Sequence, residues 1–156
     1  MTLVLVAVGF VLMEPVTYAT HRWVMHSPVG MRLHRSHHTG RHDRLEANDA
    51  FPLLFVTIGI VLAVSGLWQV AVGTLLYGIA YALVHDVYAH RRLGAVRRVP
   101  VVERLAAAHA VHHQTSGEPY GMLLPLRSST RNRANSSSRN QPSARARRTT
   151  SAWGPS

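Results

Sequence analysis

Histidine dominates the polar chemistry of this chain, which contains eleven histidines and no cysteine. Ten of them follow one spacing twice, a H-x4-H pair and then a H-x2-H-H triplet. The first set is His21, His26, His34, His37 and His38, and the second set is His85, His90, His109, His112 and His113. Only His42 lies outside the repeated pattern. The repetition predicts that the imidazole nitrogens of both sets act together.

The spacing within each set favours metal binding. On a helix, positions i, i+3 and i+4 lie on one face, so each H-x2-H-H triplet presents three rings together. The H-x4-H pairs fit less simply, because positions i and i+5 of a regular helix differ by roughly 140°. Their rings therefore either flank the site or lie on a distorted helix end. Imidazole binds Zn, Cu, Fe and Ni, and ten nitrogens exceed the four ligands of a tetrahedral zinc, so we predict a dinuclear centre.

Two apolar segments must position these histidines. Residues 2–20 carry one charge, Glu14, and lack the basic start and cleavage site of a signal peptide, so we expect a retained membrane helix. Residues 50–84 carry no charge. As one helix they would measure about 52 Å, against a hydrocarbon core of ~30 Å, so a hairpin of two spans turning at Ser65-Gly66 is the better interpretation.

This topology predicts an all-α integral membrane bundle of three to four spans. Residues 99–113 are expected to form a helix at the interface or packed against the others, and their sequence leaves a fourth span open. The spans bring all the histidines to one face of the membrane. Most arginines before residue 127 fall on the same face, which the positive-inside rule assigns to the cytoplasm. We therefore expect a multi-pass protein of the cell membrane with a dimetal site on the cytoplasmic side.

The composition changes abruptly after Leu126. Residues 127–156 are rich in Ser, Arg and Asn and contain seven arginines and no acidic residue, so they supply most of the formal charge of +10. We expect a membrane domain over residues 1–126 and a disordered tail over residues 127–156. Because the charge is concentrated in this tail, nucleic acid is not expected as a partner. The lack of cysteine excludes disulfides, thiolate catalysis and cysteine-ligated metals.

Four polar side chains are candidates for orienting the imidazole rings from outside the metal centre. Asp86 directly follows a predicted ligand, although pairing with a nearby arginine is an alternative role. Asn48 and Asp49 precede the hairpin, where capping its first helix is the alternative. Glu14 lies inside the first span, where a charge is costly and usually functional, and it precedes His21 by two helical turns. Its alternative role is structural, as a side chain that pairs within the bundle or extends to the membrane surface.

The second half of the hairpin carries an aromatic stripe. Tyr77, Tyr81 and His85 stand at i, i+4 and i+8, so the two tyrosines either line a slot for a long apolar substrate or serve helix packing. Gly73 and Gly78 on the same segment are predicted to allow close helix packing.

These motifs together resemble the β-carotene hydroxylases, within the membrane fatty-acid hydroxylase superfamily. The resemblance covers about residues 10–125 and rests on HRWVMH, LHRSHH, EAND, LVHDVYAHRR and AHAVHH, in that order. The second H-x4-H pair, from His85 to His90, has the form H-D-x3-H, which is most similar to that of the carotenoid hydroxylases. The resemblance implies that the ten repeated histidines bind two non-haem irons, whereas His42 has no counterpart among the ligands.

The activity implied by this resemblance is an O2-dependent hydroxylation of carbon 3 of a β-ionone ring. β-Carotene would pass through β-cryptoxanthin to zeaxanthin, with electrons from a donor such as ferredoxin. The sequence after Leu126 departs from the family pattern, which places the stability of the chain in question but not its ligand set.

Two other functions remain open from the sequence. A fatty-acyl or sterol hydroxylase or desaturase of the same superfamily would use the same metal chemistry with a different substrate slot. A histidine-rich membrane transporter or metal-binding protein is a separate class. Transporters bind their ions near the bilayer midplane, whereas these histidines are predicted at the ends of the spans.

Overall fold

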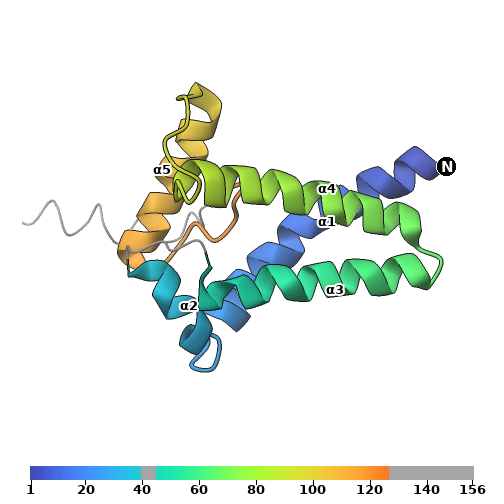
Figure 1. The fold of residues 1–156 in the computed structure, drawn as a ribbon, viewed down its shortest axis with the longest axis horizontal. Helices are drawn as coiled ribbons and strands as arrows, with labels where there is room; N and C mark the ends of the chain where they lie inside the picture. The colour runs from blue at the N-terminus through green and yellow to red at the C-terminus, as the bar shows by residue number, and fades with distance from the viewer. Residues whose placement is uncertain (40–44, 127–156) are drawn as a thin grey trace, which may run out of the picture.

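The computed structural model describes residues 1–39 and 45–126, and its secondary structure within these ranges is helical. Helices α1 (Thr2–Ala19), α3 (Ala50–Val64) and α4 (Trp68–Ala82) form an elongated shaft, and α2 (Met31–His38) and α5 (Pro100–Thr115) lie at one end of it (Figure 1). Two π-helical segments, η1 (Thr20–Met25) and η3 (Leu83–Ala89), continue α1 and α4, and a 3-10 turn, η2 (Ala47–Asp49), precedes α3. The predicted all-α fold is confirmed.

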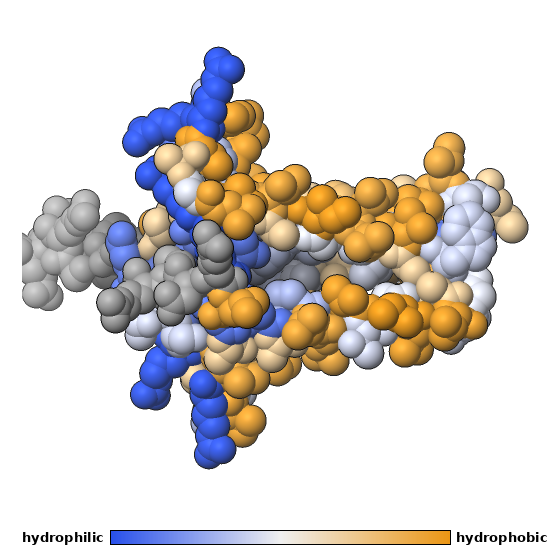
Figure 2. All heavy atoms as spheres, in the orientation of Figure 1, coloured by the Kyte–Doolittle hydropathy of each residue, from blue (hydrophilic) through white to orange (hydrophobic). Residues whose placement is uncertain are grey.

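Three stretches of the described chain are long and apolar enough to cross a membrane, namely Thr2–Met25, Ala47–Val64 and Trp68–Ala89. The predicted hairpin is confirmed, since α3 ends at Val64 and α4 begins at Trp68, with Gly66 in the turn at a φ of 86°. Apolar side chains cover the shaft, and strongly hydrophilic ones gather at the end that carries α2 and α5 (Figure 2). This distribution is the one expected for a bundle whose shaft lies in hydrocarbon.

Helices α1 and α4 approach each other through glycines. A Cβ atom at Gly9 would lie 2.4 Å from the carbonyl oxygen of Val70, and one at Gly73 would lie 2.1 Å from that of Val6. The prediction of close packing is therefore confirmed for Gly73. It is wrong for Gly78, where a Cβ would meet nothing within 4 Å.

The ten repeated histidines all lie at the end of the shaft opposite the N-terminus and the hairpin turn (Figure 1). Of the predictions made from sequence, those on His42 and on the tail over residues 127–156 fall outside the described residues. Helix α5 is not among the three membrane-crossing stretches found in the described part of the chain.

Candidate metal centre

The two π-helical segments bring each H-x4-H pair onto one face. The backbone N–H of His26 donates to the carbonyl of His21 at 3.2 Å, and that of His90 donates to His85 at 2.9 Å. These i+5 hydrogen bonds widen the helix, so the two rings of each pair lie 5.2 Å and 4.6 Å apart between centroids. Of the two geometries that the sequence left open, the distorted helix end is the one observed, and π-helical turns are frequent at functional sites.

The imidazoles form two groups whose nitrogen atoms converge. In the first nitrogen group, five ring nitrogens lie within 4.8 Å of one another, and they belong to His21, His26, His34, His38 and His112. In the second nitrogen group, four nitrogens meet the same limit, and they belong to His37, His85, His90 and His109. The Nε2 atom of His113 lies 2.9 Å from that of His109, which places His113 beside the second group.

Each H-x2-H-H triplet divides its rings between the two groups. On α2, His34 and His38 join the first group, while His37 faces the second group with its Nε2 atom 3.0 Å from that of His85. On α5 the division is reversed, because His112 crosses to the first group, with its Nε2 atom 3.2 Å from that of His26. The two halves of the repeat therefore exchange one histidine each.

The outer nitrogens of several rings are fixed by oxygen acceptors. The Nδ1 atom of His21 donates to the carbonyl of Tyr120 at 2.9 Å, and that of His34 donates to the side-chain oxygen of Asn48 at 2.7 Å. The Nδ1 atom of His112 likewise donates to the carbonyl of Gly117. Because a neutral imidazole carries one proton, a donating Nδ1 leaves a lone pair on Nε2.

These lone pairs face one another, which tests whether the residues fit a metal. The Nε2 atoms of His21 and His34 lie 3.2 Å apart although both rings donate through Nδ1, so neither Nε2 holds a proton to share. Two facing lone pairs repel each other unless a cation lies between them. Nitrogens bound at right angles around a metal, with bonds of about 2.1 Å, lie about 3 Å apart. In the second group, the Nε2 atoms of His37 and His85 lie 3.0 Å apart while their Nδ1 atoms face carboxylate oxygens. The donor set and its spacing therefore fit a metal in each group.

Burial keeps the rings neutral. His26 and His34 lie outside the membrane-crossing stretches. Burial away from water, and then repulsion from the neighbouring imidazoles, lowers the pKa of His26 to about 4 and the pKa of His34 to about 3. Burial also lowers the pKa of His112 to about 4, partly offset by its hydrogen bond to Gly117. The pKa values of His37 and His109 are also lowered, mainly by burial and then by His85. Near neutral pH these rings are in the form that binds metals.

The residues predicted to orient the rings take different places. Asp86 accepts from Nδ1 of His85 at 3.2 Å, and Asn48 bonds His34. Asp49 is not hydrogen-bonded to an imidazole in these contacts. It accepts hydrogen bonds from Arg92 and from the backbone N–H of Glu46.

Glu14 also lies away from the rings. Its carboxylate accepts from the hydroxyl of Tyr77 at 2.6 Å and from the backbone N–H groups of Leu123 and Leu124. It therefore secures the segment after α5, which carries the carbonyl of Tyr120 to His21.

Sequence reasoning missed Glu46 as a site residue. Its Oε2 atom lies 3.3 Å from Nδ1 of His37, and both side chains are almost fully buried. The signal that could have found it is its position two residues before Asn48, in the same turn that supplies a partner to His34. The carbonyls of Gly117 and Tyr120 were also missed, because every residue has a backbone carbonyl and residue type does not indicate which one will accept a hydrogen bond.

An apolar groove of about 610 Å³ leads away from the histidines between α1, α3 and α4. Figure 2 shows the hollow between α3 and α4. Its polar end includes His21, Asn48, Tyr81, His85 and Tyr120, and its far end includes Ala63 and Trp68 at the hairpin. Tyr77 and Tyr81 both line this groove. Tyr77 also packs edge-on against Phe10 of α1, so the aromatic stripe contributes to the groove wall and to helix packing.

Known proteins resemble this chain over most of its length. The fatty acid hydroxylase family model matches residues 6–127. A β-carotene hydroxylase of Paracoccus sp. is 38% identical over 77% of this chain and 80% of its own length, and one of Pseudescherichia vulneris is 36% identical over 72% and 68%. A chloroplastic β-carotene 3-hydroxylase of Haematococcus lacustris is 38% identical over 79% of this chain and 43% of its own length. No solved structure matches this chain significantly. The chain therefore belongs to the fatty acid hydroxylase family.

Proposed function

We propose that this chain is a membrane monooxygenase that hydroxylates carbon 3 of the β-ionone rings of β-carotene, giving β-cryptoxanthin and then zeaxanthin. One observation carries the proposal: two groups of converging imidazole nitrogens lie at the head of a long apolar groove. The names of the similar proteins, which are β-carotene hydroxylases of bacteria and of chloroplasts, support the substrate.

The proposed cofactor is a pair of non-haem irons, one in each nitrogen group, held by the ten repeated histidines. The irons would supply the O2 chemistry, in which one oxygen atom enters a C–H bond and the other leaves as water, with two electrons from an external donor such as ferredoxin and two protons. All ten donors are neutral imidazoles, so the binding of metal requires the rings to stay unprotonated.

The side chains of the protein would orient the rings and the substrate. The Nδ1 acceptors hold Nε2 toward the centre, so the rings are set before metal binds. The apolar walls of the groove would accept the polyene chain and keep water away from it. Tyr81 lies 4.9 Å from the ring of His85 between centroids, so it would contact a substrate ring at the head of the groove.

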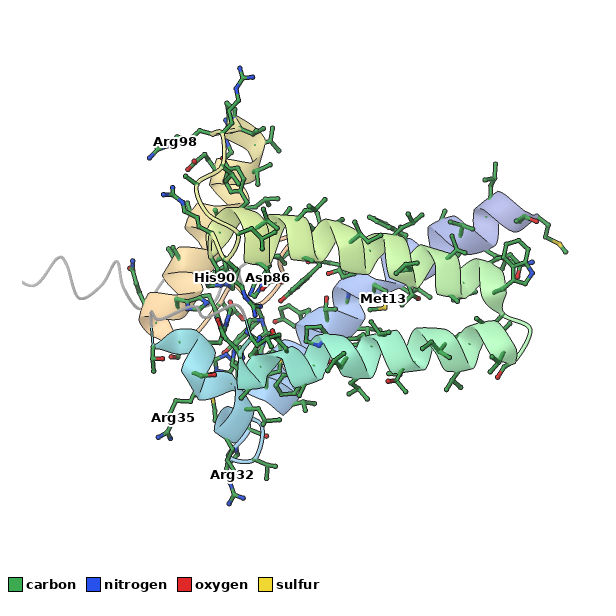
Figure 3. All side chains as sticks on the ribbon, in the orientation of Figure 1. Met13, Arg32, Arg35, Asp86, His90 and Arg98 are labelled. Atoms are coloured by element: carbon green, nitrogen blue, oxygen red, sulfur yellow. The ribbon has the colours of Figure 1, made fainter. Side chains whose placement is uncertain are left out.

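We propose that the histidine end faces the cytoplasm of the cell. Arg32, Arg35 and Arg98 project outward there, away from the shaft (Figure 3). Arginine is retained on the cytoplasmic side of membrane proteins, which supports this orientation. We also propose that residues 1–126 make up the catalytic domain and that residues 127–156 form a disordered tail outside it.

The decisive experiment is pigment chromatography in a bacterial host that already makes β-carotene. Expression of the chain should produce β-cryptoxanthin and zeaxanthin, and His112→Ala should abolish both, because it removes a nitrogen from the first group. His42→Ala is the matched control, since His42 stands outside the repeated pattern, and it should retain both products. Unchanged β-carotene with a folded, iron-loaded chain would contradict the substrate.

Two additions separate the remaining explanations. Deletion of residues 127–156 tests whether the tail disables the chain. New hydroxylated or desaturated acyl chains or sterols in the host lipids would instead identify an acyl or sterol substrate, which the family membership also accommodates.

A further inference from the structure

Arg92 joins two of the elements that surround the second nitrogen group. Its guanidinium donates to both carboxylate oxygens of Asp49, at 2.9 and 2.8 Å, and to Oδ1 of Asp86 at 2.9 Å. The side chain of Arg92 is only 10% exposed, so these contacts are largely shielded from water. A planar guanidinium that binds two carboxylates in this way holds them at a fixed separation.

Each carboxylate is connected in turn to a histidine of the second group. Asp86 accepts from Nδ1 of His85 at 3.2 Å. Asp49 accepts from the backbone N–H of Glu46 at 3.0 Å, and the carboxylate of Glu46 lies 3.3 Å from Nδ1 of His37.

These contacts form a closed circuit that begins at His37 and ends at His85. The Nε2 atoms of His37 and His85 face each other at 3.0 Å on the inside. Arg92 lies on the outside and joins the two arms, one through Asp49 and the other through Asp86.

We propose that Arg92 is a positioning residue for the metal of the second nitrogen group. By fixing Asp86 relative to Asp49, it sets the angle between the rings of His37 and His85 and so the affinity of that group for metal. The proposal rests on the proposed two-metal centre, and it assigns Arg92 to one half of that centre.

The first nitrogen group depends on Arg92 much less. Of its outer partners, the carbonyls of Tyr120 and Gly117 belong to the segment after α5, which Glu14 secures. Only Asn48, the partner of His34, shares the turn that Arg92 holds. Loss of the guanidinium should therefore weaken the second group selectively.

The neighbouring arginine offers a matched control. Arg91, directly before Arg92, is exposed and adopts a left-handed φ of 53°. Glycine adopts this conformation without strain, so Arg91→Gly removes one positive charge from the same loop and keeps the backbone path.

The test measures metal content and metal affinity in purified full-length protein, by elemental analysis and by competition with a chelator for Fe(II). Lysine keeps the charge at position 92 but lacks the planar fork that donates at once to both oxygens of Asp49 and to Asp86. Arg92→Lys should raise the dissociation constant of the second group by about 10–100-fold and that of the first group by far less. Arg91→Gly should leave both values as in the wild type.

Two backgrounds identify which group loses its metal. His112→Ala removes one nitrogen from the first group and His109→Ala removes one from the second, so each variant should bind the metal of the altered group more weakly and keep about one tightly bound metal per chain. Arg92→Lys should then release the remaining metal from the His112→Ala protein and spare it in the His109→Ala protein. Metal retained by the first group also shows that the Arg92→Lys chain is folded.

Equal loss from both backgrounds, or loss from neither, would overturn the positioning role. These results are distinct from failure of the proposed function. A wild-type chain that does not bind two metals contradicts the dimetal centre itself, whereas a two-metal wild type with a fully loaded Arg92→Lys variant contradicts only the role of Arg92.

Discussion

The hydroxyl of Tyr77 donates a 2.6 Å hydrogen bond to the carboxylate of Glu14, joining α4 to α1 inside the bundle. The hydroxyl groups of Tyr77 and Thr17 lie 2.7 Å apart, so Tyr77 contacts two positions on α1. The same carboxylate accepts the backbone N–H of Leu124 at 2.9 Å. One acidic side chain thus holds together two spans and the segment that leads back to the histidines.

Removal of this carboxylate should destabilise the whole site. Glu14→Ala leaves the Tyr77 hydroxyl and the Leu124 N–H without their acceptor, and the loss of such buried charged hydrogen bonds should cost about 2–4 kcal/mol of unfolding free energy. Glu14→Gln keeps one oxygen acceptor and should cost less. Thermal unfolding in detergent measures both. Glu103→Ala, which removes an exposed ion pair with Arg98 and a hydrogen bond from the hydroxyl of Tyr88 at 3.1 Å, is the comparison, and an equal loss from it would contradict the role of Glu14.

Acid should destabilise the metal-free protein. The folded-state pKa values of His26 and His112 are about 4 and that of His34 is about 3, below the ordinary value of 6.5, because the rings are buried. As the pH falls from 6.5 toward 4, the unfolded chain takes up protons that the folded chain does not, so stability decreases through this window and is fully present above it. The melting temperature should be lower at pH 5 than at pH 7.5.

A variant checks the source of this pH dependence. His26→Gln removes one ring whose pKa is lowered, so the difference in melting temperature between the two pH values should become smaller. A melting temperature that is equal or higher at pH 5 in the wild type would contradict the buried neutral rings.

Local spacing was sufficient to predict which ten histidines converge, because ligand binding constrains residue type and spacing along a helix. It could not predict that His37 and His112 exchange groups. That exchange depends on how α2 and α5 are placed around the centre, and the contacts that reveal it join residues 48 and 86 positions apart in sequence. Similarly, the H-x4-H spacing could not distinguish a π-helical turn from two flanking rings.

The contacts of Gly73 and Gly78 also could not be predicted from the sequence. Both are glycines of α4, and five residues turn a helix by roughly 140°, so they face different neighbours. Gly73 faces α1, whereas Gly78 lines the groove. Residue type alone does not indicate which surface a glycine serves.

The open space at Gly78 allows the groove to be blocked without altering the metal centre. Gly78→Leu places a side chain where a Cβ would meet nothing within 4 Å, so the fold should tolerate it. Hydroxylation of β-carotene should decrease at least about tenfold, as expected when a bulky group fills a binding slot, while iron content stays at the wild-type level. Leu76→Phe, on the same helix but outside the groove lining, is the control. Wild-type activity in Gly78→Leu would show that the substrate binds elsewhere.

The proposed orientation can be tested with single cysteines, because the chain contains none of its own. Ser65 lies in the turn between α3 and α4, and Gln114 lies on α5 at the histidine end, and both are exposed. In intact bacterial cells, a membrane-impermeant maleimide should label Ser65→Cys and should label Gln114→Cys only after lysis. The physical basis is the arginine-rich surface at the histidine end, which favours retention in the cytoplasm. The reverse pattern of labelling would place the histidine site on the outer face and exclude a cytoplasmic electron donor.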